Sequence, residues 1–361
     1  MIPFSNCSSR AIEINCTILF FQDLFGVLKV LVQKGWFTMD DYNLRLREFK
    51  FSSYDATDKP QDIPHRGKKM PGKAVTHWVH MRNFPLIIKP LVQDADDEIL
   101  NLALLLGDLT SRITALEFKE HEIVLLEEKI IEYLDIRKEL FCLHEDLGNP
   151  KPKHHLLTHY GQSVRLFGPP LSYWTGRFES KHRIAKNVAE TAKNFKNISL
   201  TVSVRQQMRM ASVYYRGMFE TRKFIPPQNA LYKGDITTDS GELLWVKVAE
   251  FMNNDDLVCD DVIFMEQKYQ KNDLVVLQVL EDGDFLRVGL IVKIVIKRGH
   301  VFFVLRKFDA VKEKLGYYQS LPAVVEYSFA EAGSLVDPKP LIRHGTDLKF
   351  QFVLHHNVSA E

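Results

Sequence analysis

Residues 178–196 read FESKHRIAKNVAETAKNFK, and this stretch predicts an amphipathic helix with a strongly basic surface. Apolar residues recur at helical spacing, so we expect one face of the helix to be buried. The apolar positions that share this face are Phe178, Ile184, Val188 and Ala192. Against the acids Glu179 and Glu190, the cations in and next to the helix are Arg177, Lys181, Arg183, Lys186, Lys193 and Lys196.

This positive charge is concentrated in a chain that is almost neutral overall. The 361 residues contain 47 Lys and Arg and 46 Asp and Glu, which gives a formal net charge of +1. Arg205 and Arg209 repeat the spacing of Arg177 and Lys181, so each pair would line up on one helical face. A polyanion would meet a row of cations. The predicted nucleic-acid-binding residues are Arg177, Lys181, His182, Arg183, Lys186, Lys193, Lys196, Arg205 and Arg209.

The charge pattern leaves a second class of function open. Lysines on a solvated helix often do no more than keep a protein soluble. The chain would then be a structural or protein-interaction module with an incidental basic face, and self-association or a protein partner would fit. The sequence contains no zinc finger or clear helix-turn-helix for reading bases. Binding to nucleic acid would therefore involve mainly the backbone of double-stranded DNA, with low sequence specificity.

Short motifs surround the basic helix in a fixed order. They are Pro152-Lys153-His154-His155, Phe167-Gly168-Pro169, Phe178-Glu179 followed by Lys181-His182, Asn194-Phe195-Lys196-Asn197, and Arg205 to Gln207. With this order and spacing, the chain resembles the C-terminal part of the transposases of CACTA (EnSpm-like) DNA transposons and the related transposase-like proteins of animal genomes. Looser similarity covers most of the chain, and the specific part is 152–209.

The resemblance implies the end of an RNase H-like transposase core. In that family two aspartates and one glutamate hold two divalent ions, such as Mg²⁺, for phosphoryl transfer. Glu179 matches the family's glutamate and would be a metal ligand only in a complete active site. The first aspartate is expected upstream of Met1. Where family members carry Asp-x-x-His-Asp-Leu and then Glu-Gly, this chain has Leu19-Phe20-Phe21-Gln22-Asp23-Leu24-Phe25-Gly26.

These departures predict a truncated, transposon-derived protein without catalytic activity. Glu179 would then be a vestigial catalytic residue, and no cofactor is expected. A second possibility is that the chain is a fragment of an active metal-dependent DNA transposase, in which case Mg²⁺ would be its cofactor.

Periodicity predicts an α+β protein of several domains. Helices are expected at 24–34, 39–49, 75–88, 99–116 and 120–141, with an exposed loop at 52–72. They would form a helical bundle over 1–150, which the resemblance equates with the insertion of the transposase core. Residues 151–222 would hold two or three basic helices, including the one that bears Glu179.

The pattern changes to short alternating apolar runs after Pro226-Pro227. Strands are expected at 243–248, 274–280, 286–296, 300–308 and 348–354, with Lys297-Arg298-Gly299 as one of the turns. A small antiparallel β-barrel or rolled sheet of five to seven strands is therefore predicted for 231–357.

Other candidate sites carry less weight. His155 and His159 lie four residues apart, but the sequence supplies no third metal ligand, and buried or phosphate-contacting histidines are expected instead. His355 and His356 are adjacent on a predicted strand and would face opposite ways. Cysteines without regular spacing and the absence of a secretory signal predict an intracellular protein of the nucleus or cytoplasm. Residues 16–32 are interpreted as a buried helix, not a membrane span.

Overall fold

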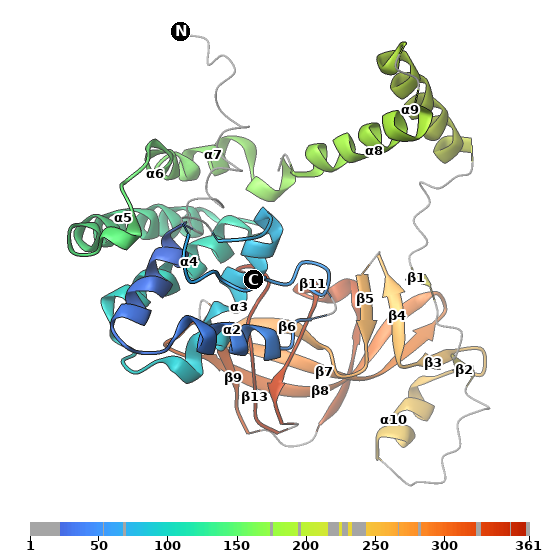
Figure 1. Ribbon diagram of the computed structural model, residues 1–361. Coiled ribbons are helices and arrows are strands. Elements are labelled where there is room, and N and C mark those ends of the chain that lie inside the picture. The colour runs from blue at the N-terminus through green and yellow to red at the C-terminus, as the bar shows by residue number, and fades with distance from the viewer. Residues whose placement is uncertain are drawn as a thin grey trace.

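A computed structural model shows an α+β protein in which helices come first and a curled antiparallel half-barrel sheet follows (Figure 1). It describes residues 22–358 except 53, 68–69, 174–175, 194–195, 216–223, 226–229, 233–242, 266, 281–282, 323–325 and 347. We call residues 22–215 the helical part and residues 224–358 the β-rich part.

The helical part begins with the helix over 22–33, followed by α2 (Met39–Glu48). Gly35, at φ +76°, occupies the left-handed conformation that ends the first helix. Thr38 then caps α2 through a capping box with Asp41. Leu24 and Leu28 are fully buried, which confirms the expected buried helix over its described residues. In the part of the chain that the structure describes, no helix has both the length and the apolarity needed to cross a membrane.

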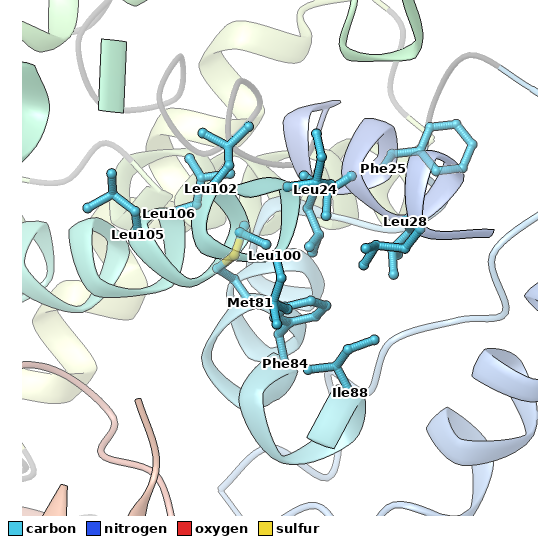
Figure 2. Packing of buried hydrophobic residues seen from close by; sticks show 14 of the residues in the cluster. Leu24, Phe25, Leu28, Met81, Phe84, Ile88, Leu100, Leu102, Leu105 and Leu106 are labelled. Carbon is cyan, nitrogen blue, oxygen red and sulfur yellow. The ribbon is translucent and has the colours of Figure 1, made fainter. Parts of the chain in front are cut away.

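The next helices confirm the expected periodicity. They are α3 (Ala74–Ile88), η1 (Lys89–Leu91), α4 (Glu98–Ile113) and α5 (Glu120–Leu143). Figure 2 shows how Met81 and Phe84 of α3 pack near Leu100 of α4 and Leu24 of the first helix. The described residues of the loop at 52–72 contain neither helix nor strand, as expected.

The remaining helical elements are short ones followed by two longer helices, which form the basic region. They are η2 (Glu145–Leu147), α6 (Pro152–Leu157), α7 (Tyr160–Phe167), η3 (Pro170–Ser172), α8 (Gly176–Ala192) and α9 (Ile198–Tyr215). Figure 1 shows α8 and α9 beyond α7, away from α3, α4 and α5. Asn194 and Phe195 of the Asn194-Phe195-Lys196-Asn197 motif lie outside the described residues.

The sheet of the β-rich part is built on three long strands that are adjacent both in sequence and in space. These are β6 (Leu274–Leu280), β7 (Phe285–Lys297) and β8 (His300–Lys312), paired antiparallel. Arg298 and Gly299 both have positive φ, so the β7–β8 connection is the tight hairpin turn that the sequence predicts. Alternate residues such as Leu286 and Phe308 fill the concave core.

The β-rich part also contains shorter strands, most of which belong to the same sheet. They are β1 (Phe224–Ile225), β2 (Leu231–Tyr232), β3 (Leu257–Cys259), β4 (Asp261–Phe264), β5 (Gln267–Gln270), β9 (Tyr318–Ser320), β10 (Tyr327–Glu331), β11 (Asp337–Leu341), β12 (His344–Gly345) and β13 (Phe350–Phe352), with η6 (Ala332–Ser334) after β10. β1, β4 and β5 form a separate three-stranded sheet, and the main sheet has ten strands within the described residues. The main sheet is thus larger than the five to seven strands expected.

One predicted strand is wrong. Residues 243–248 belong to a helix, α10 (Leu243–Phe251). The run contains Val and Trp, which favour strands, but its buried side chains Leu244, Val248 and Met252 recur every four residues. That spacing places them on one helical face against Val258 and Val295 of the sheet, so packing overrides the local strand propensity.

The two parts meet along α3, α4 and the last residues of the chain. The backbone N–H of Asn357 donates to the carbonyl of Ser111 in α4 at 3.0 Å. Lys339 of β11 places its ammonium nitrogen 5.6 Å from the ring of Trp78 in α3. The C-terminal residues therefore tie the β-rich part to the helical part.

Candidate nucleic-acid interface

The predicted basic helix is present as α8, and the following basic segment is α9. Ile184, Val188 and Ala192 are half-buried at four-residue spacing, as expected for one packed face. α8 and α9 contact each other. Lys193 has φ 47°, a left-handed conformation just after the last helical residue, which ends α8. Together α8 and α9 form a basic unit, the α8–α9 arm.

Five of the predicted binding residues have described side chains, and all five are exposed. They are Lys186, Lys193, Lys196, Arg205 and Arg209. The side chains of Arg177, Glu179, Lys181, His182 and Arg183 lie outside the described part, although their backbone belongs to α8. The described geometry therefore bears only on the C-terminal half of the predicted stripe and on α9.

The described cations lie at several points along the arm. Lys186 lies in the second half of α8, and Lys193 follows directly after its last residue, Ala192. Arg205 and Arg209 lie one turn apart on α9. Their charges are therefore spaced along a surface and do not converge on one point. Such an arrangement suits an extended anion better than a compact one.

Some exposed cations elsewhere in the described residues form ion pairs, and four of those in the arm do not, a property they share with other exposed lysines such as Lys59 and Lys271. Within the described side chains, Lys186, Lys193, Arg205 and Arg209 form no ion pair. In contrast, Arg165 of α7 contacts both Glu120 and Glu127, at 2.8 and 2.6 Å. Those carboxylates hold the pKa of Arg165 above its usual value. The cations of the arm remain available to an external anion.

Asp23, which the resemblance matches to the family's Asp-Leu pair, is buried in an ion-pair network. Arg137 of α5 donates to both of its carboxylate oxygens, at 2.6 and 3.0 Å, and Tyr133 donates to Oδ2. Burial opposes ionisation, but His154, Arg137 and Tyr133 together hold the pKa of Asp23 below its usual value. This carboxylate serves the packing of the first helix against α5 and is not open to solvent.

The histidines that the sequence singled out fall into different environments. His155 and His159 are exposed, with their Nε2 atoms 3.3 Å apart, so of the two alternatives expected the buried one is wrong and contact with phosphate stays a prediction. A search of the described residues finds no group of three or more His, Cys, Asp or Glu side chains that could hold a metal ion. Glu179, the predicted metal ligand, is outside the side chains described.

A buried polar cluster at the junction of the two parts was not predicted. His355 and His356 follow β13 outside any strand, so their predicted strand geometry is wrong. His355 Nε2 lies 3.0 Å from the carbonyl of Pro340, and His356 Nε2 lies 3.7 Å from Oδ1 of Asp337. Burial lowers the pKa of His356 to about 3 and raises that of Asp337 to about 6.

The signal for this junction cluster was weak in the sequence. Adjacent histidines near a strand predict alternation, because nothing local shows that the strand ends at Phe352. The buried ion pair of Arg82 with Asp55 joins a helix to a loop, and no spacing rule indicates it. The cluster closes the junction between the helical and β-rich parts.

Comparisons with protein-family models, with curated proteins and with solved structures found no match to this chain. The resemblance to CACTA transposases therefore rests on the sequence motifs alone.

Proposed function

We propose that this chain is a transposon-derived protein that binds the backbone of double-stranded DNA through the α8–α9 arm. The observation that carries the proposal is the exposure of Lys186, Lys193, Arg205 and Arg209 without any ion pair among the described side chains. In a chain whose formal net charge is only +1, unpaired cations on two contacting helices make a local positive surface.

Backbone contact is the mode of binding that such a surface supports. Lysine and arginine neutralise phosphates and release condensed counterions, which gives affinity without reading base sequence. Spaced cations on helix surfaces fit a regular row of phosphates. Binding should therefore be of similar strength on unrelated duplexes.

We also propose that the protein is catalytically inactive. By resemblance, α8 would be the glutamate helix of an RNase H-like core, with Glu179 left from its catalytic site. Leu19 and Gln22 stand where the family carries an acid and a histidine. Asp23, the acid retained in that stretch, is bonded to Arg137 and Tyr133 and is 1% exposed, which makes it unsuitable as an open metal ligand.

The proposal is tested with two double variants on unrelated duplexes of equal length at low salt. Lys186→Gln with Lys193→Gln, and Arg205→Gln with Arg209→Gln, should each weaken binding on every duplex. Lys59→Gln with Lys271→Gln, which removes two exposed lysines elsewhere, is the matched control and should bind like the parent. Equal binding by all four proteins would reject the arm as the binding surface.

A second function, a protein-interaction module, is favoured by the apolar surface of α9. Leu200, Met208 and Tyr215 are 59%, 66% and 94% exposed. Exposed apolar side chains on one helix are typical of contact surfaces. If a second copy covers them, light scattering should give a dimer mass at micromolar concentration, and Leu200→Glu with Met208→Glu should give a monomer.

A further inference from the structure

A second basic region lies at the junction of the helical and β-rich parts, far from the arm in the sequence. It is a cavity of about 570 Å³ whose walls include the end of α2, the end of α3, η1, β12 and β13. The side chains that matter here are Arg45, Phe49, Lys50, Lys89, Arg343 and His344. We call it the junction pocket. Each part contributes at least one arginine, so neither forms it alone.

The lining of the junction pocket has an excess of positive charge. Four cations, Arg45, Lys50, Lys89 and Arg343, stand against one acid, Glu48. Among the described residues, Arg45 and Lys50 form no ion pair. Lys89 lies with its ammonium nitrogen 4.6 Å from the ring centre of Tyr317.

Two polar atoms in this region are buried without a partner. In the described structure, Nε of Arg45 and Nε2 of His344 have no hydrogen-bond acceptor or donor within reach. An unsatisfied buried donor is costly, and a bound anion at this place would satisfy it. Burial, with the nearby charge of Lys50, lowers the pKa of His344 to about 4. The ring is therefore neutral at pH 7 and can donate one N–H to an anion.

The wall of the pocket also offers a flat ring surface. Phe49 and His344 stack with ring centres 4.5 Å apart and an angle of 26° between planes. A volume of about 570 Å³ exceeds what one tetrahedral oxyanion needs and falls in the range of small-ligand sites. The pocket can thus hold a charged group beside a larger organic portion.

We propose that the junction pocket binds a phosphoryl group, free or carried by a small ester, with Arg45, Lys50, Lys89 and Arg343 as its cationic partners. Phosphate suits the site because it is a dianion with several acceptor oxygens, and arginine binds it through directional N–H donors. A ligand held by α2 and α3 on one side and β12 on the other also stabilises the junction. The shared chemistry is the phosphoryl group, whether it comes from a nucleotide or from inorganic phosphate.

The test uses the full chain and isothermal titration at constant ionic strength, with inorganic phosphate, AMP and adenosine as probes. Phosphate and AMP should bind with a stoichiometry of about one, and adenosine should bind at least about tenfold more weakly than AMP. Tighter binding of AMP than of phosphate identifies a nucleotide-type ligand, and equal binding identifies the free anion. Absence of saturable binding of both up to about 10 mM would overturn the proposal.

Variants locate the site and separate it from the α8–α9 arm. Arg45→Gln and Lys89→Gln should each weaken AMP and phosphate binding about tenfold, while Lys271→Gln should leave it unchanged. If a variant fails to fold, the ring signals of His344 in the parent supply an independent readout, because bound phosphate should shift them and His65 should not respond. Parent-like affinity in Arg45→Gln, or unmoved His344 signals at saturation, would overturn the assignment.

Discussion

Nε2 of His154 lies 3.7 Å from Oδ2 of Asp23, and the approach joins two sequence segments that resemble separate transposase motifs. The backbone N–H of Lys151 donates to Nδ1 of His154 at 2.8 Å, which orients the ring with Nε2 toward the carboxylate. Arg137 and Tyr133 complete the contacts of Asp23. The network fixes the first helix, α5 and α6 relative to one another.

Removing the carboxylate of this network should destabilise the protein strongly. Asp23→Ala leaves Arg137 charged and buried without its partner, which costs about 3–5 kcal/mol. Urea unfolding followed by circular dichroism measures the loss. The matched control is Asp62→Ala, which removes the exposed partner of Arg47 and should cost under about 1 kcal/mol. Equal losses for the two variants would contradict a structural role for Asp23.

Two helical glycines should respond in opposite directions to alanine. A Cβ at Gly26 would lie 2.7 Å from the carbonyl oxygen of Asp146 and 3.0 Å from Cα of Leu147. Backbone cannot move aside easily, so Gly26→Ala should destabilise by about 1–3 kcal/mol. At Gly107 of α4 the nearest atom is 3.8 Å away, and Gly107→Ala should stabilise by up to about 1 kcal/mol. Thermal unfolding of both variants checks the signs, and a stabilised Gly26→Ala would refute the close packing.

Acidification should destabilise the fold through buried His80. Burial, with the nearby His77, lowers the pKa of His80 to about 3, and its Nε2 lies 2.7 Å from the hydroxyl oxygen of Tyr42. The folded state excludes the proton that the unfolded state binds near pH 6.5. The free energy of unfolding is therefore unaffected by the titration of His80 above pH 6.5, and it falls as the pH falls, by roughly 3 kcal/mol at pH 4.

The pH effect is measured by urea unfolding of the parent and His80→Gln between pH 7 and pH 4. The free-energy difference between the two should shrink or reverse toward pH 4. His65→Gln serves as the control. The His65 side chain is exposed, so the unfolding free energy of this variant should follow that of the parent across the pH range. A parent-to-His80→Gln difference that does not change with pH would contradict the assignment.

Divalent ions should not make the protein cut DNA. Catalysis by two metal ions needs several carboxylates that converge from different elements, and we propose that Glu179 lacks those partners. Purified protein with Mg²⁺ or Mn²⁺ should neither nick nor join a plasmid, and Glu179→Gln should behave identically. Metal-dependent cleavage that is abolished by Glu179→Gln would contradict the proposed inactivity and indicate an active transposase.

Periodicity was enough to predict the helices up to α5 and the long hairpin of the sheet, whereas the described residues of 151–215 form four α-helices in place of the two or three expected. α4 and α5 bury one continuous stripe each, and Arg298-Gly299 supplies a turn that only a few residue types adopt. α10 was missed because its helical face is set by contact with the sheet, which local propensity does not report.

The candidate sites were predictable to different degrees. The basic arm could be found because its cations are close in sequence and follow helical spacing. The junction pocket could not, since Arg45 and His344 come from segments that only the tertiary fold brings together. The same holds for Asp23 and His154, whose contact depends on how α6 returns to the first helix.

The salt dependence of DNA binding tests the central claim most directly. Affinity of the parent for one duplex, measured by fluorescence anisotropy over a salt series, should fall log-linearly as phosphate contacts release counterions. Lys186→Gln with Lys193→Gln should make that slope shallower by about two, one unit for each contact removed, and Lys59→Gln with Lys271→Gln should leave it unchanged. A parent that does not bind at low salt, or an arm variant with the parent's slope, would contradict the account.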